Sequence, residues 1–196
     1  MEEYFERCRY TNCSMMIPNF KEDKATQAAA LLLSLKGAPM SHLKLMKLLY
    51  IAEREAILRW RRPIIFDRYV SMNKGPVLSQ TLNKMHGECE TTGSWERFIS
   101  TPENNKVKLL GDPGIESLSD AEEALLREVF SLYGHMNRWR LCDLTHEFPE
   151  WEDPQGSSIP ILYEDILRGA GKTDIEIASI VDEIENIAMM DNYMGQ

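Results

Sequence analysis

The sequence predicts a mainly α fold, α+β only through a minor small β-sheet or hairpin, arranged as a single compact helical domain. Apolar residues recur at helical spacing over most of the chain, and helix-start and helix-stop residues flank these stretches. The few strand-like stretches are short and do not alternate with helices, so a doubly wound parallel sheet is not expected. A chain of 196 residues is long enough to bury a hydrophobic core.

The first two helices are predicted from their boundaries. A helix over residues 22–36 contains ATQAAALLLSL and ends at Gly37 and Pro39, which are typical stop signals. A second helix over residues 42–61 is expected to have Ser41 as its N-cap and to end before Pro63. Its apolar residues cover more than one face, which predicts a central, buried helix. They include Leu43, Leu45, Met46, Leu49, Tyr50, Ala52 and Ile57.

The middle of the chain predicts short extended segments around one helix. The stretches IIF and RYVSM contain the β-branched and aromatic residues typical of strands. In the loop NKGPV, Gly75 is expected to adopt positive φ, and Pro76 is expected to open a helix over residues 77–87. The Gly, Pro and Asn content of residues 93–114 predicts irregular structure, with WERFIS and KVKLL as the strands of a small hairpin.

Capping residues predict the helices of the second half. Ser119 and Glu122 form a capping box for LSDAEEALLREVFSLYG, and Asn137 caps RWRLCDLTH. An acidic loop, EFPEWEDPQGSS, then leads to PILYEDILRG. Thr173 and Glu176 form a second capping box for the last helix, which extends to about residue 190.

These elements divide the chain into three parts. Residues 1–20 are predicted to be an N-terminal arm, and residues 21–170 the helical domain. Residues 171–196 are predicted to form an acidic C-terminal helix that packs on the domain or extends it. After Lys172 the chain contains six acidic residues and no basic residue.

Composition argues against membrane, metal and disulfide classes. No apolar run approaches the roughly 20 residues that span a bilayer, so no membrane partner is expected. The start MEEYFERCRY carries acidic residues and does not resemble a signal peptide, which makes the cytoplasm the expected location. The cysteines and histidines lack metal-binding spacing, so we expect reduced thiols, no metal and no cofactor. The cysteines are Cys8, Cys13, Cys89 and Cys142.

Basic residues concentrate in one segment of an otherwise acidic chain. Residues 44–74 contain eight basic and three acidic residues, a net charge of +5, whereas the whole chain has −9 and the remainder therefore −14. These basic side chains could contact nucleic acid, an acidic patch on a partner protein, or the chain's own acidic residues. A sequence pI of about 5.0 argues against nucleic acid, because domains that bind it by charge are usually basic overall.

The sequence lacks the motifs of the common enzyme classes. No GxGxxG, GxxxxGK[ST] or GxSxG pattern occurs, so we expect no catalytic activity. His146 next to Glu147 could form half of a proton-transfer pair, although a histidine at a helix end more often interacts with the terminal carbonyl groups. Cys142 next to Asp143 has no basic activator nearby in sequence and is expected to be a buried, inert thiol.

Three segments in order carry a family resemblance: LKLMKLLYIAE, NKGPVLSQTL and LSDAEEALLREVFSLYGHMNRWRLCDLTHEFPEW. Together they resemble the Panacea domain, the family that includes the SocA-type antitoxins, over about residues 20–169. No single segment is specific, but the three in this order are fairly specific. The matching residues are Lys44, Lys47, Leu48, Leu49 and Tyr50; Lys74, Gly75, Pro76 and Val77; and Leu144, Thr145, His146 and Trp151.

The resemblance implies an antitoxin that neutralises a cognate toxin by direct protein–protein binding. The implied toxin is a toxic small alarmone synthetase or a similar translation-targeting enzyme. The alternative implied by SocA is a proteolytic adaptor that delivers the toxin to a Clp-type protease. Some relatives carry a helix-turn-helix extension, for which the roughly 20 residues before the first helix leave no room. The last acidic helix lies beyond the matched segments.

Five residues are the candidates for partner binding: Lys44, Lys47, Lys74, His146 and Trp151. The lysines and His146 are too polar for packing alone to explain. Trp151 lies between two prolines in the acidic loop and is either a lid over the core or an exposed anchor. Leu48, Leu49 and Tyr50 are expected in the core, and Gly75 and Pro76 to shape a turn.

Overall fold

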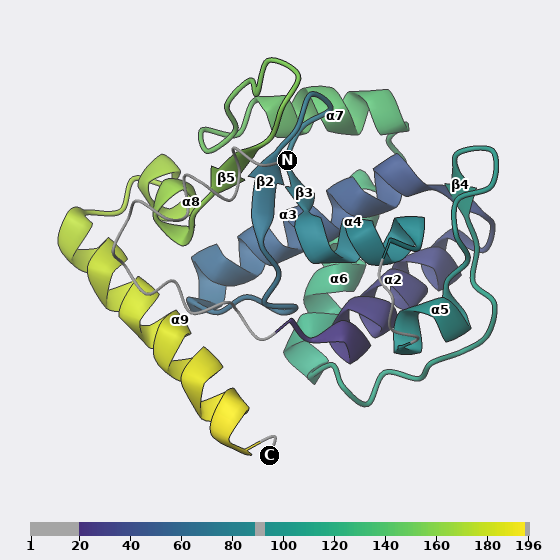
Figure 1. The fold of residues 1–196 in the computed structure, drawn as a ribbon, viewed down its shortest axis with the longest axis horizontal. Coiled ribbons are helices and arrows are strands. Elements are labelled where there is room, and N and C mark those ends of the chain that lie inside the picture. The colour runs from purple at the N-terminus through teal and green to yellow at the C-terminus, as the bar shows by residue number, and fades with distance from the viewer. Residues whose placement is uncertain (1–19, 89–92, 195–196) are drawn as a thin grey trace.

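The computed structural model describes residues 20–88 and 93–194, and Figure 1 shows their arrangement. Helices dominate this described part, which confirms the predicted mainly α fold. The helices are α2 (Glu22–Lys36), α3 (His42–Trp60), α4 (Ser79–His86), α5 (Ser94–Phe98), α6 (Asp120–Tyr133), α7 (Arg138–His146), α8 (Tyr163–Gly169) and α9 (Asp174–Met194).

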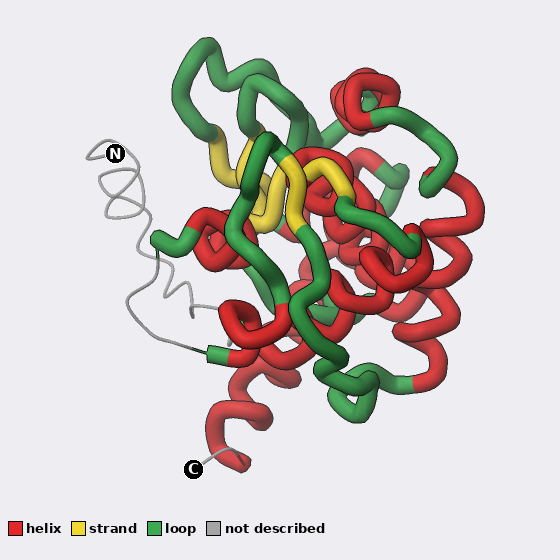
Figure 2. Tube along the Cα trace, turned by 90° about the vertical axis from the view of Figure 1, so that its right-hand side faces the viewer, coloured by secondary structure: helices red, strands yellow, loops and turns green. Residues whose placement is uncertain are grey.

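The strands form two small antiparallel sheets, which lie beside the helices in Figure 2. In one sheet, β1 (Met40–Ser41) pairs with β4 (Lys106–Val107). In the other, β2 (Tyr69–Ser71) lies between β3 (Val77–Leu78) and β5 (Ile159–Ile161). The second sheet therefore joins the segment after α3 to the segment before α8.

Helix α3 is the centre of the molecule. It contacts α2, α6, α7, α8 and both small sheets, and it crosses the molecule from the β4 side toward α9 (Figure 1). Its apolar side chains are buried on several faces, as predicted, because neighbours surround the helix. The fully buried residues among them include Leu45, Leu48, Leu49 and Tyr50.

Most predicted helix ends are confirmed by their caps. The Ser119 hydroxyl accepts from the Glu122 N–H, and the Glu122 carboxylate accepts from the Ser119 N–H at 2.8 Å. The Asn137 side chain accepts from the first N–H groups of α7. Ser41 occupies the N-cap position of α3 as predicted, but its side chain forms no capping bond, and its hydroxyl is buried without a hydrogen-bond partner among the described residues.

The predicted WERFIS–KVKLL hairpin is wrong for its first strand. Residues 94–98 form α5, because the Glu22 carboxylate accepts from the Trp95 N–H at 3.1 Å and the indole is buried beside α2. The start of KVKLL is a strand, β4, but it pairs with β1. Only an isolated bridge between Ile99 and Leu109 remains of the predicted pairing.

Buried carboxylates shape the segment between α3 and α4. Glu53 accepts from the N–H groups of Ile64 and Ile65 and from the Tyr69 hydroxyl at 2.6 Å, so IIF is fixed to α3 and does not pair as a strand. Burial raises the pKa of Glu53 to about 7. Asp67 accepts from the first N–H groups of α4 and so fixes the start of this helix at Ser79. Pro76 was predicted to open the helix, but it precedes β3 instead.

Helix α9 packs mainly on α8 along one side. Ile177, Ile180 and Ile184 are buried, and Asp191 forms an ion pair with Lys21. The Thr173–Glu176 capping box is formed as predicted. The predicted N-terminal arm falls almost entirely outside the described residues. Within the described part, none of the helices has the length and apolarity needed to cross a bilayer.

Candidate partner-binding surface

The segments that carry the family resemblance meet above the first half of α3. The loop between β2 and β3 crosses the second turn of this helix, and α7 with the acidic loop after it closes over the same place. Lys47, Gly75, Thr145, His146 and Trp151 lie together there, and we call these five residues the motif cluster.

Lys47 is the buried centre of the motif cluster. Its side chain has 0% exposure, and its ammonium group donates to the Pro76 carbonyl at 2.6 Å. Burial lowers the pKa of Lys47 to about 7, because a charged ammonium group loses its hydration in this interior. Lys47 therefore holds the loop onto α3 and presents no charge at the surface.

Gly75 lets the loop approach α7 closely. Its φ of +91° favours glycine, as predicted from NKGPV. A Cβ atom on Gly75 would lie 2.6 Å from the Thr145 hydroxyl and 3.0 Å from the Lys47 ammonium nitrogen. The backbone of the GPV segment therefore packs directly against side chains of the LTH segment. Any residue larger than glycine at position 75 requires these neighbouring atoms to shift.

His146 and Trp151 cover the same loop from outside. Their ring centroids lie 4.1 Å apart, and the Trp151 indole N–H donates to the Met72 carbonyl at 3.2 Å. Burial lowers the pKa of His146, and the charge of Lys47 lowers it further. Both side chains are half-buried, so Trp151 lies as a lid on the loop while part of each ring remains accessible.

The other two candidate residues lie apart from this arrangement. Lys44 is buried and donates to the Gly134 and Met136 carbonyls at 2.5 and 2.7 Å, where it satisfies the C-terminal end of α6. Lys74 is exposed at the tip of the loop. The partner-binding role of all five residues stays a prediction, but Lys74, His146 and Trp151 are the ones that reach the surface.

A buried ion pair below the lid was missed in the sequence. Glu150 accepts from the Arg54 guanidinium at 2.7 Å and from the Tyr50 hydroxyl at 3.1 Å. Arg54 also lies over the Phe148 ring at 4.5 Å. The sequence feature that could have predicted this pair is the spacing of Tyr50 and Arg54. They lie one helical turn apart on α3, so both can donate to one carboxylate from the same face of the helix.

Two further arginine contacts bear on the basic segment. Arg59 pairs with Glu55 and forms two hydrogen bonds to Glu128, at 2.8 and 2.9 Å. The pairings of Arg54 and Arg59 support the alternative in which the basic segment binds the chain's own acidic residues. Arg61 and Arg62, at the end of α3, remain exposed.

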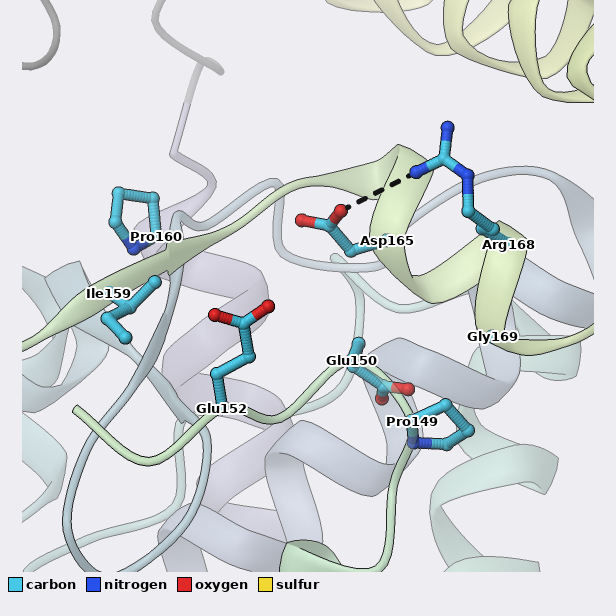
Figure 3. A pocket seen from close by; sticks show the side chains of 8 residues that line it. All are labelled: Pro149, Glu150, Glu152, Ile159, Pro160, Asp165, Arg168 and Gly169. Atoms are coloured by element: carbon cyan, nitrogen blue, oxygen red, sulfur yellow. Dashed lines mark ion pairs between the residues drawn. The ribbon is translucent and has the colours of Figure 1, made fainter.

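An acidic pocket opens on the other side of Glu150 (Figure 3). It has a volume of about 410 Å³ and lies between the acidic loop, β5 and α8. The Glu152 and Asp165 side chains extend into the same space, and Arg168 pairs with Asp165 at 3.8 Å on the α8 side. The lining residues are Pro149, Glu150, Glu152, Ile159, Pro160, Asp165, Arg168 and Gly169.

A family model described as Antitoxin SocA-like, Panacea domain matches residues 45–152. This is more than half of the chain. The chain belongs to the SocA-like Panacea family.

The family match covers the motif cluster but not the whole fold. It begins inside α3 and ends in the acidic loop, so it is narrower than the predicted resemblance over about residues 20–169. Helix α2, β5 and the helices after it lie outside it. Comparison with curated proteins and with solved structures found no match. Membership of a SocA-like antitoxin family indicates a role in a toxin–antitoxin pair.

Proposed function

We propose that this Panacea protein neutralises its cognate toxin by binding it directly and covering the surface that the toxin needs for activity. The proposed toxin is a small alarmone synthetase or another translation-targeting enzyme, and the proposed location is the cytoplasm. The antitoxin itself performs no catalysis in this proposal. Its shape and charge supply the inhibition.

The observation that carries the proposal is the family match together with the internal hydrogen bonds of the motif cluster. Within this cluster, Lys47 is hydrogen bonded to the chain's own backbone, and Trp151 closes over the loop. Such contacts make a rigid scaffold, and rigid scaffolds bind partners with little loss of conformational entropy. The motif residues therefore support a binding protein whose surface is held in a fixed shape.

Charge supports a basic toxin surface as the target. Outside residues 44–74 the chain has a net charge of −14, and α9 exposes the adjacent acids Asp182 and Glu183. We call these two residues the acidic α9 face. Met190, which is 65% exposed on the same helix, supplies apolar area for an anchor. Enzymes that act on RNA or nucleotides usually carry basic surfaces, which an acidic face attracts over a distance.

Co-expression with the protein encoded by the neighbouring reading frame tests the proposal. That protein alone should halt growth. The Panacea protein should restore growth, and the two proteins should co-elute with a constant molar ratio. Restored growth without any complex in pull-down and size-exclusion chromatography would contradict direct binding. The experiment needs no knowledge of the toxin's reaction.

The same rescue, repeated in cells that lack the Clp protease, separates direct inhibition from proteolytic delivery. Direct inhibition predicts unchanged rescue and an unchanged toxin level. An adaptor predicts that rescue disappears and that the toxin accumulates. The second result would replace the proposed mechanism with the adaptor mechanism.

A further inference from the structure

Four basic side chains from four different elements converge at the start of α3. His42 is the first residue of α3, Lys74 lies in the β2–β3 loop, His86 ends α4, and Arg138 begins α7. The rings of His42 and His86 lie 5.6 Å apart, edge to face. We call these four residues the cationic cluster.

Hydrogen bonds hold three segments around the first turns of α3, and the ring contact with His42 places His86 of α4 beside them. Lys44 donates to the Gly134 and Met136 carbonyls, which brings the α6–α7 turn over the first turn of α3. Lys47 donates to the Pro76 carbonyl, which places the β2–β3 loop next to it. The His42 N–H and ring both contact the Asn105 carbonyl, at 3.1 Å each. The buried lysines of α3 thus assemble the exposed cationic cluster.

Three basic side chains act on His42 in addition to its burial. Burial lowers its pKa most, and the charges of His86, Lys74 and Arg138 lower it further, while the Asn105 carbonyl opposes them. Asp143, further along α7, is the acidic residue that borders the cluster, because its charge acts with those of Lys74 and Arg138 on Cys142.

The backbone at this place adds to the same polarity. The first turn of α3 contains no acidic residue, and no side chain caps it. The positive end of the helix dipole therefore points toward the cluster. The Ser41 hydroxyl next to His42 is buried and has no hydrogen-bond partner among the described residues. The helix dipole is independent of the side-chain charges, and it also favours an anion.

We propose that the cationic cluster is a docking site for an acidic segment of a partner protein, whose carboxylates pair with Lys74 and Arg138 and hydrogen bond to the imidazole rings of His42 and His86. Trp139 is 53% exposed, and Arg138 lies over its ring at 4.8 Å, so an apolar anchor adjoins the charges. Tryptophan and arginine are the residues most enriched at the energetic centres of protein interfaces.

A protein segment fits the cluster better than a nucleic acid. The cluster has four basic groups, whereas the chain as a whole carries −9 and would repel the rest of a long polyanion. A short acidic segment contacts only the locally positive cluster and does not extend over the negative remainder of the surface. The inference rests on the proposed function only for the identity of the partner, since the anion site itself can be measured on the purified protein alone.

The test measures binding of a fluorescently labelled hexaglutamate peptide to the full-length protein at low salt. Lys74→Glu and Arg138→Glu should each weaken binding at least fivefold. Arg62→Glu is the matched control, because Arg62 is an exposed arginine just beyond the other end of α3, about 30 Å away along this helix. It should change binding less than twofold. Circular dichroism of each variant checks that it is folded.

A second readout follows His42 directly by NMR. Saturation with the peptide should raise the pKa of His42, because carboxylates favour the charged imidazolium. Three results would overturn the inference: absent peptide binding, equal weakening by Arg62→Glu, or tighter binding of a single-stranded oligonucleotide of the same charge. Peptide binding that persists while no toxin complex forms would contradict the proposed function and leave the docking site in place.

Discussion

The motif cluster and the acidic α9 face both contain charged side chains on helices, but these side chains have opposite surroundings. In the motif cluster, Lys47 is buried and bonded to backbone within the chain. On α9, Asp182 and Glu183 point into solvent. Lys47, inside the family-matched region, therefore helps to build one rigid shape, whereas Asp182 and Glu183 of α9, outside the match, remain available to a partner.

This contrast separates two roles of charged residues, stabilising the fold and attracting a partner, which the net charge of the chain does not distinguish. Substitutions of the buried motif-cluster residues Lys47 and Gly75 should reduce the free energy of unfolding and affect binding only through the fold. Substitutions on α9 should leave stability unchanged and alter association with the toxin. The following predictions test the contrast, beginning with the largest expected effect.

Removing the Glu150 carboxylate should produce the largest loss of stability. Glu150→Ala leaves the partly buried Arg54 guanidinium and the Tyr50 hydroxyl without their acceptor. Breaking a buried pair in this way costs about 3–5 kcal/mol, measured by urea denaturation. The control Glu128→Ala removes the exposed partner of Arg59 and should leave the urea midpoint unchanged. Equal effects of the two changes would contradict the assignment of Glu150 to the core.

Alanine at Gly75 should be the next most damaging change. Gly75→Ala combines an unfavourable positive φ with a contact of 2.6 Å to the Thr145 hydroxyl, for a loss of about 3 kcal/mol. Gly156 is a matched control, because its φ is +95° but no atom lies within 4 Å of its Cβ position. Gly156→Ala should lose only about 1 kcal/mol, and denaturation midpoints of both variants measure the difference.

The buried state of Lys47 should appear as a pH dependence of stability. Between pH 7 and 10 the unfolded chain holds a proton on Lys47 that the folded chain has released, since burial lowers the folded pKa to about 7. Stability therefore rises with pH in this window. The slope reaches about 1.4 kcal/mol per pH unit.

Substitution of Lys47 by methionine should remove this slope. Urea denaturation of wild type and Lys47→Met at several pH values from 7 to 10 measures it as a growing difference between the two proteins. Lys74→Met, in the exposed part of the same loop, serves as the control and should retain the wild-type slope. A slope shared by wild type and Lys47→Met would show that Lys47 is not its source.

Local signals in the sequence were enough to predict most elements. The Ser119–Glu122 and Thr173–Glu176 boxes act within one helical turn, so their effect does not depend on the rest of the fold. Gly37 ends α2 in the left-handed conformation, as its position predicts. The breadth of the apolar face of α3 also correctly predicted a central helix, because only burial on several sides requires it.

Long-range contacts decided what the sequence could not predict. WERFIS forms a helix because the Glu22 carboxylate accepts from the Trp95 N–H across 73 positions in the chain. Lys44 and Lys47 were rightly identified as unusual lysines, but their acceptors are backbone carbonyls of distant segments. A backbone carbonyl has no residue type that a sequence pattern can identify, so the interior position of both lysines was not visible.

The smallest expected effect concerns α9 and should appear only in the rate of association. Glu183→Lys changes an exposed charge without any described contact, so the denaturation midpoint should not move. Its complex with a basic toxin should form a few-fold more slowly at low salt, with the difference fading as salt screens the charges. The measurement is the association rate by stopped flow or surface plasmon resonance.

Glu116→Lys is the matched control, because Glu116 is an exposed glutamate far from α9 in the chain. If both variants slow association equally, net charge alone steers the toxin and the acidic α9 face has no special part.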